Sequence, residues 1–384
     1  MPRLFASWLL LAPFTAVHAV GPPDVFAGVS GTAAGSRPPP VPRATTYRVE
    51  TSEKFDALCL INLLSDDPFY IRYYPGEHAW WREYVSADTL AAARRIKQVL
   101  KDEGGGIVSA SLVLYFSASR SATLAGALRD LEHLDALRRR FERTPYYDAT
   151  EWTRFVSIAP ELRTVLRGLQ AAHFPQYWAS ALKARLEERA AVFRPALAGR
   201  DLVPLQEKML GFRLKDRSIT VYLVHFTRPH GIKVTGNRFL TAAELSPEIV
   251  LRTAIHEMMH PPFDTADPAL WAAVEPIRVH PLVVDRLAHH DPSFGYNTFE
   301  GLLEEGVVKT LDQFIAERLG IAVPAAERWR TNDQGLHVIA AALYQVMRQD
   351  RYDETGGNAA AYLRDPQHVR RIVGALDRIA ASGL

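Results

Sequence analysis

Hydrophobic residues recur along the chain with two different periods, and the change between them falls near residue 200. Before this point, apolar residues return every three or four positions, which predicts amphipathic helices. The apolar run at 107–116 fits either a buried strand or a helix, because it shows no period. The helices predicted in this part cover residues 87–103, 124–143, 151–172 and 177–198.

After residue 200 the pattern changes to β-branched and aromatic residues in alternation. Residues 218–226 form such a segment and predict a strand, and the segment 231–240, with two glycines, predicts a hairpin or an irregular edge strand. A helix is predicted from Ser246, a capping residue, to His260, where Pro261 stops it. Further helices are predicted at 299–319, 333–349 and 366–381. The predicted fold class is therefore α+β, mostly helical, with a small mixed sheet.

The first residues resemble a secretory signal. Met1-Pro2-Arg3 carries a positive charge, residues 4–17 are apolar, and small residues stand at Val17 and Ala19. We therefore expect a signal peptide at residues 1–19, with an uncleaved anchor as the alternative. Residues 20–46 are rich in Pro, Gly and Ala and predict a disordered leader.

These features divide the rest of the chain into a helical region at 47–205 and a second domain at 206–384. The expected localisation is export, to the periplasm or the medium, without stable membrane insertion once the signal is cleaved.

Composition narrows the class of partner. The chain has 384 residues, 48% hydrophobic and 23% charged, with a formal net charge of +2, which is typical of a globular protein. No basic stripe indicates a nucleic acid partner. Cys59 is the only cysteine, so it forms no internal disulfide, and its apolar neighbours predict a buried position.

The strongest chemical signal is His256-Glu257-Met258-Met259-His260. Residues four apart on a helix share one face, about 5–6 Å apart at Cβ, so both imidazoles can reach one metal ion. Zinc binds imidazole nitrogen at about 2.0–2.1 Å and keeps three protein ligands plus water in catalytic sites. Glu257 can then reach the metal-bound water as a general base. The alternative is two surface histidines on an ordinary helix.

A third ligand is needed, and the extended metzincin pattern is absent because Pro261-Pro262-Phe263-Asp264 follows the motif. The motif, together with the downstream Glu304-Glu305-Gly306, resembles the gluzincin clan of zinc peptidases, although no single family is identified. The resemblance implies a zincin-like catalytic domain with an active-site helix and a C-terminal helical part. It also implies Glu305 as the third metal ligand.

The helical period argues partly against this choice, since Glu304 shares the apolar stripe of Val308 and Leu311 and points into the core. Glu304 therefore stays an alternative ligand, and whichever glutamate is not a ligand is expected to orient a histidine. Asp312 lies on the same face as Glu305, seven residues on, and could also orient a ligand, but an exposed helical acid is the favoured expectation at this position.

In gluzincins a Tyr or His further along often stabilises the negative charge that develops on the substrate. The candidates are Tyr296, His337, Tyr344 and Tyr362, of which His337 and Tyr362 are taken here as candidate catalytic residues. The segment 231–240 is a candidate for binding substrate backbone by strand addition.

The expected function is thus an exported peptidase with one Zn²⁺ per chain, acting on a peptide or protein. The alternatives are a non-catalytic exported zinc-containing binding protein and a metal hydrolase of a non-peptide bond.

Overall fold

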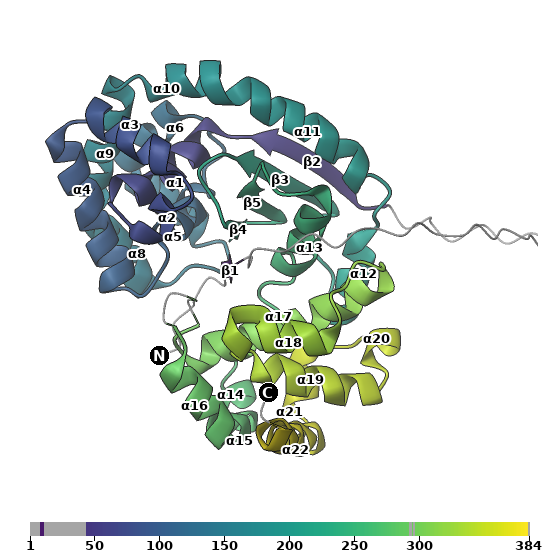
Figure 1. Cartoon of the computed structure of the whole chain (residues 1–384). Coiled ribbons are helices and arrows are strands. Elements are labelled where there is room, and N and C mark those ends of the chain that lie inside the picture. Colours follow the sequence, from purple (N-terminus) through teal and green to yellow (C-terminus); the bar gives the residue numbers. More distant parts are fainter. Residues whose placement is uncertain (1–7, 11–43, 292–293, 295, 383–384) are drawn as a thin grey trace, which may run out of the picture.

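The computed structural model describes residues 8–10, 44–291, 294 and 296–382. Helices dominate, and the strands form one small mixed sheet, which confirms the α+β class. Figure 1 shows the sheet in the middle of the molecule, with the helices between residues 53 and 171 gathered on one side. The helices that follow α13 (Pro247–Glu257) lie on the other side, so α13 connects the two parts.

The sheet has the order β1-β4-β5-β3-β2, in which β1 is a three-residue strand. β2 and β5 both run parallel to β3, whereas β4 runs antiparallel to β5. The predicted strand at 218–226 is β3, and the predicted hairpin at 231–240 is the pair β4 and β5. β1 lies antiparallel along the outer edge of β4, with Leu9 opposite Gly231. The bounds are β1 (Trp8–Leu10), β2 (Thr46–Thr51), β3 (Ser218–Val224), β4 (His230–Val234) and β5 (Arg238–Ala242).

The part before the sheet is helical as predicted, but several predicted helices are divided. The segment 124–143 forms two helices that meet at His133, and 151–172 forms two that meet at Ile158. The ambiguous apolar run at 107–116 is a helix. The α-helices are α1 (Glu53–Leu64), α2 (Pro68–Ile71), α3 (Pro75–Tyr84), α4 (Ala87–Lys97), α5 (Val108–Phe116), α6 (Leu124–Glu132), α7 (Leu134–Phe141), α8 (Ala149–Ser157), α9 (Ala159–Ala171), α10 (Phe174–Tyr177), α11 (Lys183–Leu197) and α12 (Leu202–Leu210).

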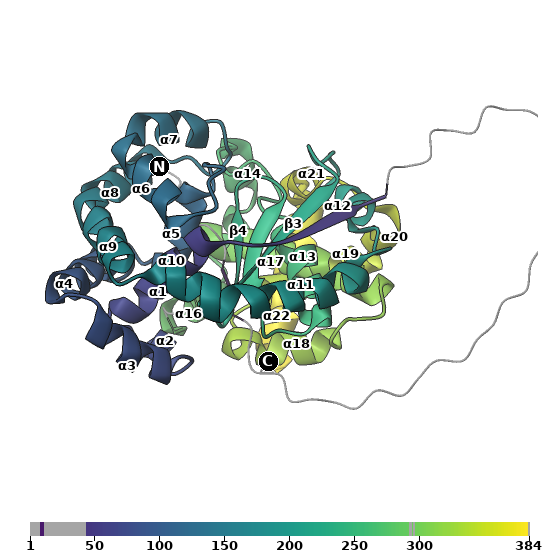
Figure 2. The same cartoon turned by 90° about the horizontal axis from the view of Figure 1, so that it is seen from above.

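The later helices form the second part of the molecule. α17 is the longest of them and is buried along almost its whole length, packing against both α13 and α19. Figure 2 shows α11 lying along the strands β2 and β3. The remaining bounds are α14 (Pro268–Ala273), α15 (Glu275–Arg278), α16 (Pro281–His289), α17 (Phe299–Arg318), α18 (Ala325–Thr331), α19 (Val338–Gln349), α20 (Tyr352–Thr355), α21 (Ala359–Arg364) and α22 (Pro366–Ser382).

Most of the predicted signal peptide and leader falls outside the described residues. β1 lies within the predicted signal peptide, and the segments 1–7 and 11–43 are not described. Among the helices that are described, none combines the length and hydropathy needed to cross a membrane. Cys59 is fully buried on α1, as its apolar neighbours predict.

Candidate metal centre

The helix that carries the motif begins as its sequence predicts. The Ser246 side chain accepts a hydrogen bond from the backbone N–H of Ile249 at 3.3 Å, and Pro247 occupies the first helical position. Its end differs from the prediction, because α13 stops at Glu257 and not at His260. The residue before a proline is disfavoured in the helical conformation, so Pro261 ends the helix early.

The imidazole side chains of His256 and His260 nevertheless lie on the same side of this segment. The backbone N–H of Met259 bonds to the carbonyl of His256, which continues the chain as a tight turn. The two imidazole rings lie 5.0 Å apart between centroids, and the residues His256 and His260 are 2% and 7% exposed. This burial excludes the alternative of two surface histidines.

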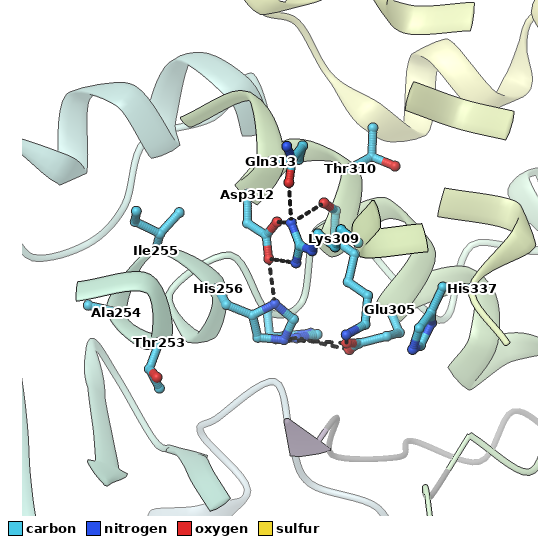
Figure 3. A network of polar contacts seen from close by, with 12 residues as sticks. Thr253, Ala254, Ile255, His256, Glu305, Lys309, Thr310, Asp312, Gln313 and His337 are labelled. Atoms are coloured by element: carbon cyan, nitrogen blue, oxygen red, sulfur yellow. Dashed lines mark hydrogen bonds and ion pairs between the residues drawn. The ribbon is translucent and has the colours of Figure 1, made fainter. Parts of the chain in front are cut away.

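The carboxylate that meets these histidines comes from α17. Oε1 of Glu305 lies 3.5 Å from Nε2 of His256, and its Oε2 lies 3.6 Å from Nε2 of His260. The two Nε2 atoms are 3.2 Å apart. Figure 3 shows His256 and Glu305 pointing toward each other from the two helices. These three buried residues form a group that could hold a metal ion.

The other nitrogen of each histidine is bonded to an acid from the same helix, α17. Nδ1 of His256 is 2.8 Å from Oδ2 of Asp312, and Nδ1 of His260 is 3.1 Å from Oε1 of Glu304. Such carboxylates fix the orientation of a ligating imidazole and leave its Nε2 free for the metal. Glu304 is thus placed against a histidine while Glu305 faces both Nε2 atoms.

Asp312 is buried, so the expectation of an exposed acid at this position is wrong. The guanidinium of Arg328, on α18, bonds both of its carboxylate oxygens, the second at 2.9 Å. Sequence reasoning could not find Arg328, because nothing in the local pattern of α18 indicates its partner.

The electrostatics of the group favour a cation. Burial alone lowers the pKa of His256, but the charge of Glu305 and the hydrogen bond with Asp312 outweigh it and raise the pKa to about 9. Burial alone would also raise the pKa of Glu305, yet the charges of His256 and Lys309 hold it well below its usual value. The carboxylate is therefore ionised, and in the metal-free protein it draws a proton onto the histidine.

Glu257 lies beside this group but forms none of the hydrogen bonds and ion pairs described above. It is fully buried, and neither of its carboxylate oxygens has a hydrogen-bond partner among the described residues. Burial raises its pKa. A buried carboxylate without a hydrogen-bond partner is costly, so its presence at this position points to a functional role.

The close approach of α13 to β4 places Glu257 beneath the edge of the sheet. A Cβ on Gly231 would lie 2.4 Å from Cγ2 of Thr253 and 3.5 Å from Oε1 of Glu257. Only a glycine fits so near the helix. Lys233, on the same strand, is buried, and burial lowers its pKa to about 7 while the charge of Glu257 opposes that shift.

The two other candidate catalytic residues lie in different surroundings. His337 is buried near Glu305 (Figure 3), and its Nε2 bonds to Asp333. Burial, with the charge of Lys309, lowers its pKa, so the ring is neutral and its Nδ1 is an acceptor. The Tyr362 hydroxyl donates to Asp350 at 2.5 Å, and its ring stacks on His368, in a separate cluster of the C-terminal helices.

Tyr296, also a candidate from the sequence, lies nearer to the group. It is 2% exposed, and burial together with the charge of Glu305 raises its pKa well above the ordinary value. Its ring packs edge-on against His337 at 5.2 Å between centroids. The sequence does not distinguish it from the other tyrosines, because it precedes α17 in a segment without a regular pattern.

Comparisons with known proteins add no family: no family model, no curated protein and no solved structure matched the chain. The residues of the candidate metal centre therefore carry the functional argument.

Proposed function

We propose that this protein is a zinc-dependent peptidase. The observation that carries the proposal is the spacing of the three ligand atoms. Two ligands that each lie about 2.0–2.1 Å from a tetrahedral zinc ion are about 3.4 Å apart. In the group formed by His256, His260 and Glu305, the two Nε2 atoms are 3.2 Å apart. The Glu305 carboxylate comes within 3.5 Å of one of them through Oε1 and within 3.6 Å of the other through Oε2. One ligand atom from each of the three residues lies within 4.8 Å of the other two. Two imidazoles and one carboxylate are also the donor set of known catalytic zinc sites.

The charge around the group supports a divalent ion. Five buried carboxylates interact with one another or with the histidines, and three cationic side chains interact with these carboxylates. The buried carboxylates outnumber these cationic side chains, and a divalent cation would offset the excess of negative charge. The acids are Glu257, Glu304, Glu305, Asp312 and Asp333, and the cations are Lys233, Lys309 and Arg328.

The number of ligands favours catalysis over a structural role. Structural zinc sites usually close all four positions with protein side chains, whereas catalytic sites use three and keep one for water. Among the described residues, the group has three members. A bound zinc ion would lower the pKa of a water molecule in the fourth position toward about 7.

In this proposal Glu257 is the general base. Its carboxylate is buried beside the histidines and has both oxygens free of hydrogen bonds within the described part of the chain. It is therefore able to accept a proton from water and to pass it to the leaving nitrogen. Asp312 and Glu304 hold the two imidazoles in place during this transfer.

A peptide is the substrate that the surroundings of Glu257 favour. The outer edge of β4 pairs with an extended segment of the same chain, β1, in antiparallel register. The pairing places Leu9 opposite Gly231, next to which Glu257 lies. A substrate backbone bound by strand addition at this edge would run past the general base. This arrangement of edge strand, motif helix and downstream glutamate is zincin-like and resembles the gluzincin clan.

Digestion of a peptide library tests the proposal, with Glu257→Gln beside the wild type. Loss of the base is expected to slow cleavage by roughly 10²–10⁴-fold and to leave the zinc content unchanged, because Glu257 is not among the three proposed ligands. Glu248→Gln is the matched control, since Glu248 lies on the same helix but is exposed and paired with Arg252. Cleavage that survives Glu257→Gln at the wild-type rate would contradict the mechanism.

A further inference from the structure

Lys309 is a buried lysine that no part of the proposed mechanism uses. It lies one helical turn after Glu305 on α17, and its side chain is 1% exposed. Its Nζ is 3.2 Å from Oε1 of Glu305 and 3.8 Å from Oδ2 of Asp333. Figure 3 shows the Lys309 side chain running along the helix with its amine directed at the Glu305 carboxylate.

Asp333, the second acid beside Lys309, lies in a turn of unusual backbone conformation. Asp333 adopts a left-handed backbone conformation with φ of 46°, as does Gln334 with φ of 56°. Residues other than glycine seldom adopt this conformation. The side chain of Asp333 also accepts a hydrogen bond from His337. The turn between α18 and α19 therefore places a carboxylate against Lys309 from outside the helix that carries the proposed ligand.

Lys309 distinguishes the two oxygens of Glu305. Each oxygen lies at nearly the same distance from one histidine nitrogen, 3.5 Å for Oε1 and 3.6 Å for Oε2. The ammonium ion contacts Oε1, so that oxygen already has a positive partner. We propose that Lys309 is a positioning residue that holds Oε1 of Glu305, so that Glu305 binds the metal through Oε2 alone and a position stays open for water.

This inference rests on the proposed function and makes it more specific. A glutamate that bound through both oxygens would add a fourth protein atom to the metal and compete with water. The ammonium ion opposes this through its ion pair with Oε1, although its charge also repels a cation. Metal affinity can therefore change in either direction when Lys309 is replaced, and the coordination number is the property to measure.

Cobalt substitution measures the coordination number directly, because the visible absorption of Co²⁺ weakens as its coordination number rises. At saturating Co²⁺ we expect an intense, four-coordinate band for the wild type and a clearly weaker band for Lys309→Met. Lys54→Met is the matched control, since Lys54 is equally buried but donates to backbone carbonyls of Phe116 and Ser119, away from the group. Equal bands for the wild type and Lys309→Met would overturn the inference.

A double variant gives a second test that does not depend on the spectrum. In Glu305→Gln the amide oxygen is expected to turn to Lys309, which leaves the NH₂ group toward the metal and weakens Co²⁺ binding. Adding Lys309→Met frees that oxygen, so this substitution should tighten Co²⁺ binding at least tenfold more in the Glu305→Gln background than in the wild-type background, which accounts for the loss of charge. An equal effect of Lys309→Met in both backgrounds would contradict a positioning role. Failure of the wild type to bind Co²⁺ would instead contradict the proposed function.

Discussion

Glu304 and Glu305 are adjacent in the sequence but contact different atoms of the site. Glu305 faces both Nε2 atoms, whereas Glu304 bonds to Nδ1 of His260. We expect Glu304→Ala to lower zinc affinity by about 10–100-fold, the usual effect of losing a group that orients a ligand. Glu305→Ala removes a ligand and should lower it further. Competition with a coloured chelator measures both affinities, and a larger loss in Glu304→Ala would reverse the assignment.

The pKa of His256 predicts how metal binding depends on pH. In the metal-free protein this pKa is raised to about 9, so His256 carries a proton at pH 7. A metal must displace that proton, and its affinity should therefore rise with pH up to about 9 and then level off. Calorimetric titration with zinc at pH 7, in buffers with different enthalpies of ionisation, should reveal the released proton. The same binding enthalpy in every buffer would contradict this prediction.

At the scale of the elements, the contact between β4 and α13 sets the position of Glu257. Gly231→Ala would place a methyl group 2.4 Å from Cγ2 of Thr253, so strand and helix must separate. We expect a loss of about 1–3 kcal/mol in the free energy of unfolding, typical of overpacking, and a lower kcat. Thr253→Ser removes that carbon, so adding it should recover most of the stability in chemical denaturation. A double variant no more stable than Gly231→Ala would show that the strain lies elsewhere.

The elements also show how far the sequence could predict the fold. Residue alternation and end signals in the sequence predicted the strand β3, the hairpin and the long helix α17. Breaks such as that at His133 were missed, because tertiary packing and not local sequence ends those helices. The motif predicted both histidines, since their spacing along the chain is enough to bring them together.

The remaining site residues depend on the packing of α17, which no local pattern shows. Almost every residue of its first four turns is buried, so its apolar stripe did not separate Glu304 from Glu305. The resemblance of the motif to gluzincins, and not the helical period, favoured Glu305. Lys309 and Asp333 were missed because their roles come from contacts between α17 and the turn before α19.

At the scale of the whole molecule, the candidate centre joins the two parts of the chain. α13 follows the sheet and supplies the motif, and α17 belongs to the C-terminal helices and supplies the carboxylates (Figure 1). The three proposed ligands therefore meet only when both parts have folded against each other. A metal ion bound to all three would link the two parts and stabilise the folded chain.

A crystal structure of the zinc-loaded protein, with anomalous data at the zinc edge, tests the central claim most directly. The account predicts one zinc ion per chain, about 2.0–2.2 Å from Nε2 of His256, Nε2 of His260 and an oxygen of Glu305. It also predicts a water molecule in the fourth position, near Glu257. An absent zinc signal would contradict the claim. So would a fourth protein ligand, which would make the site structural.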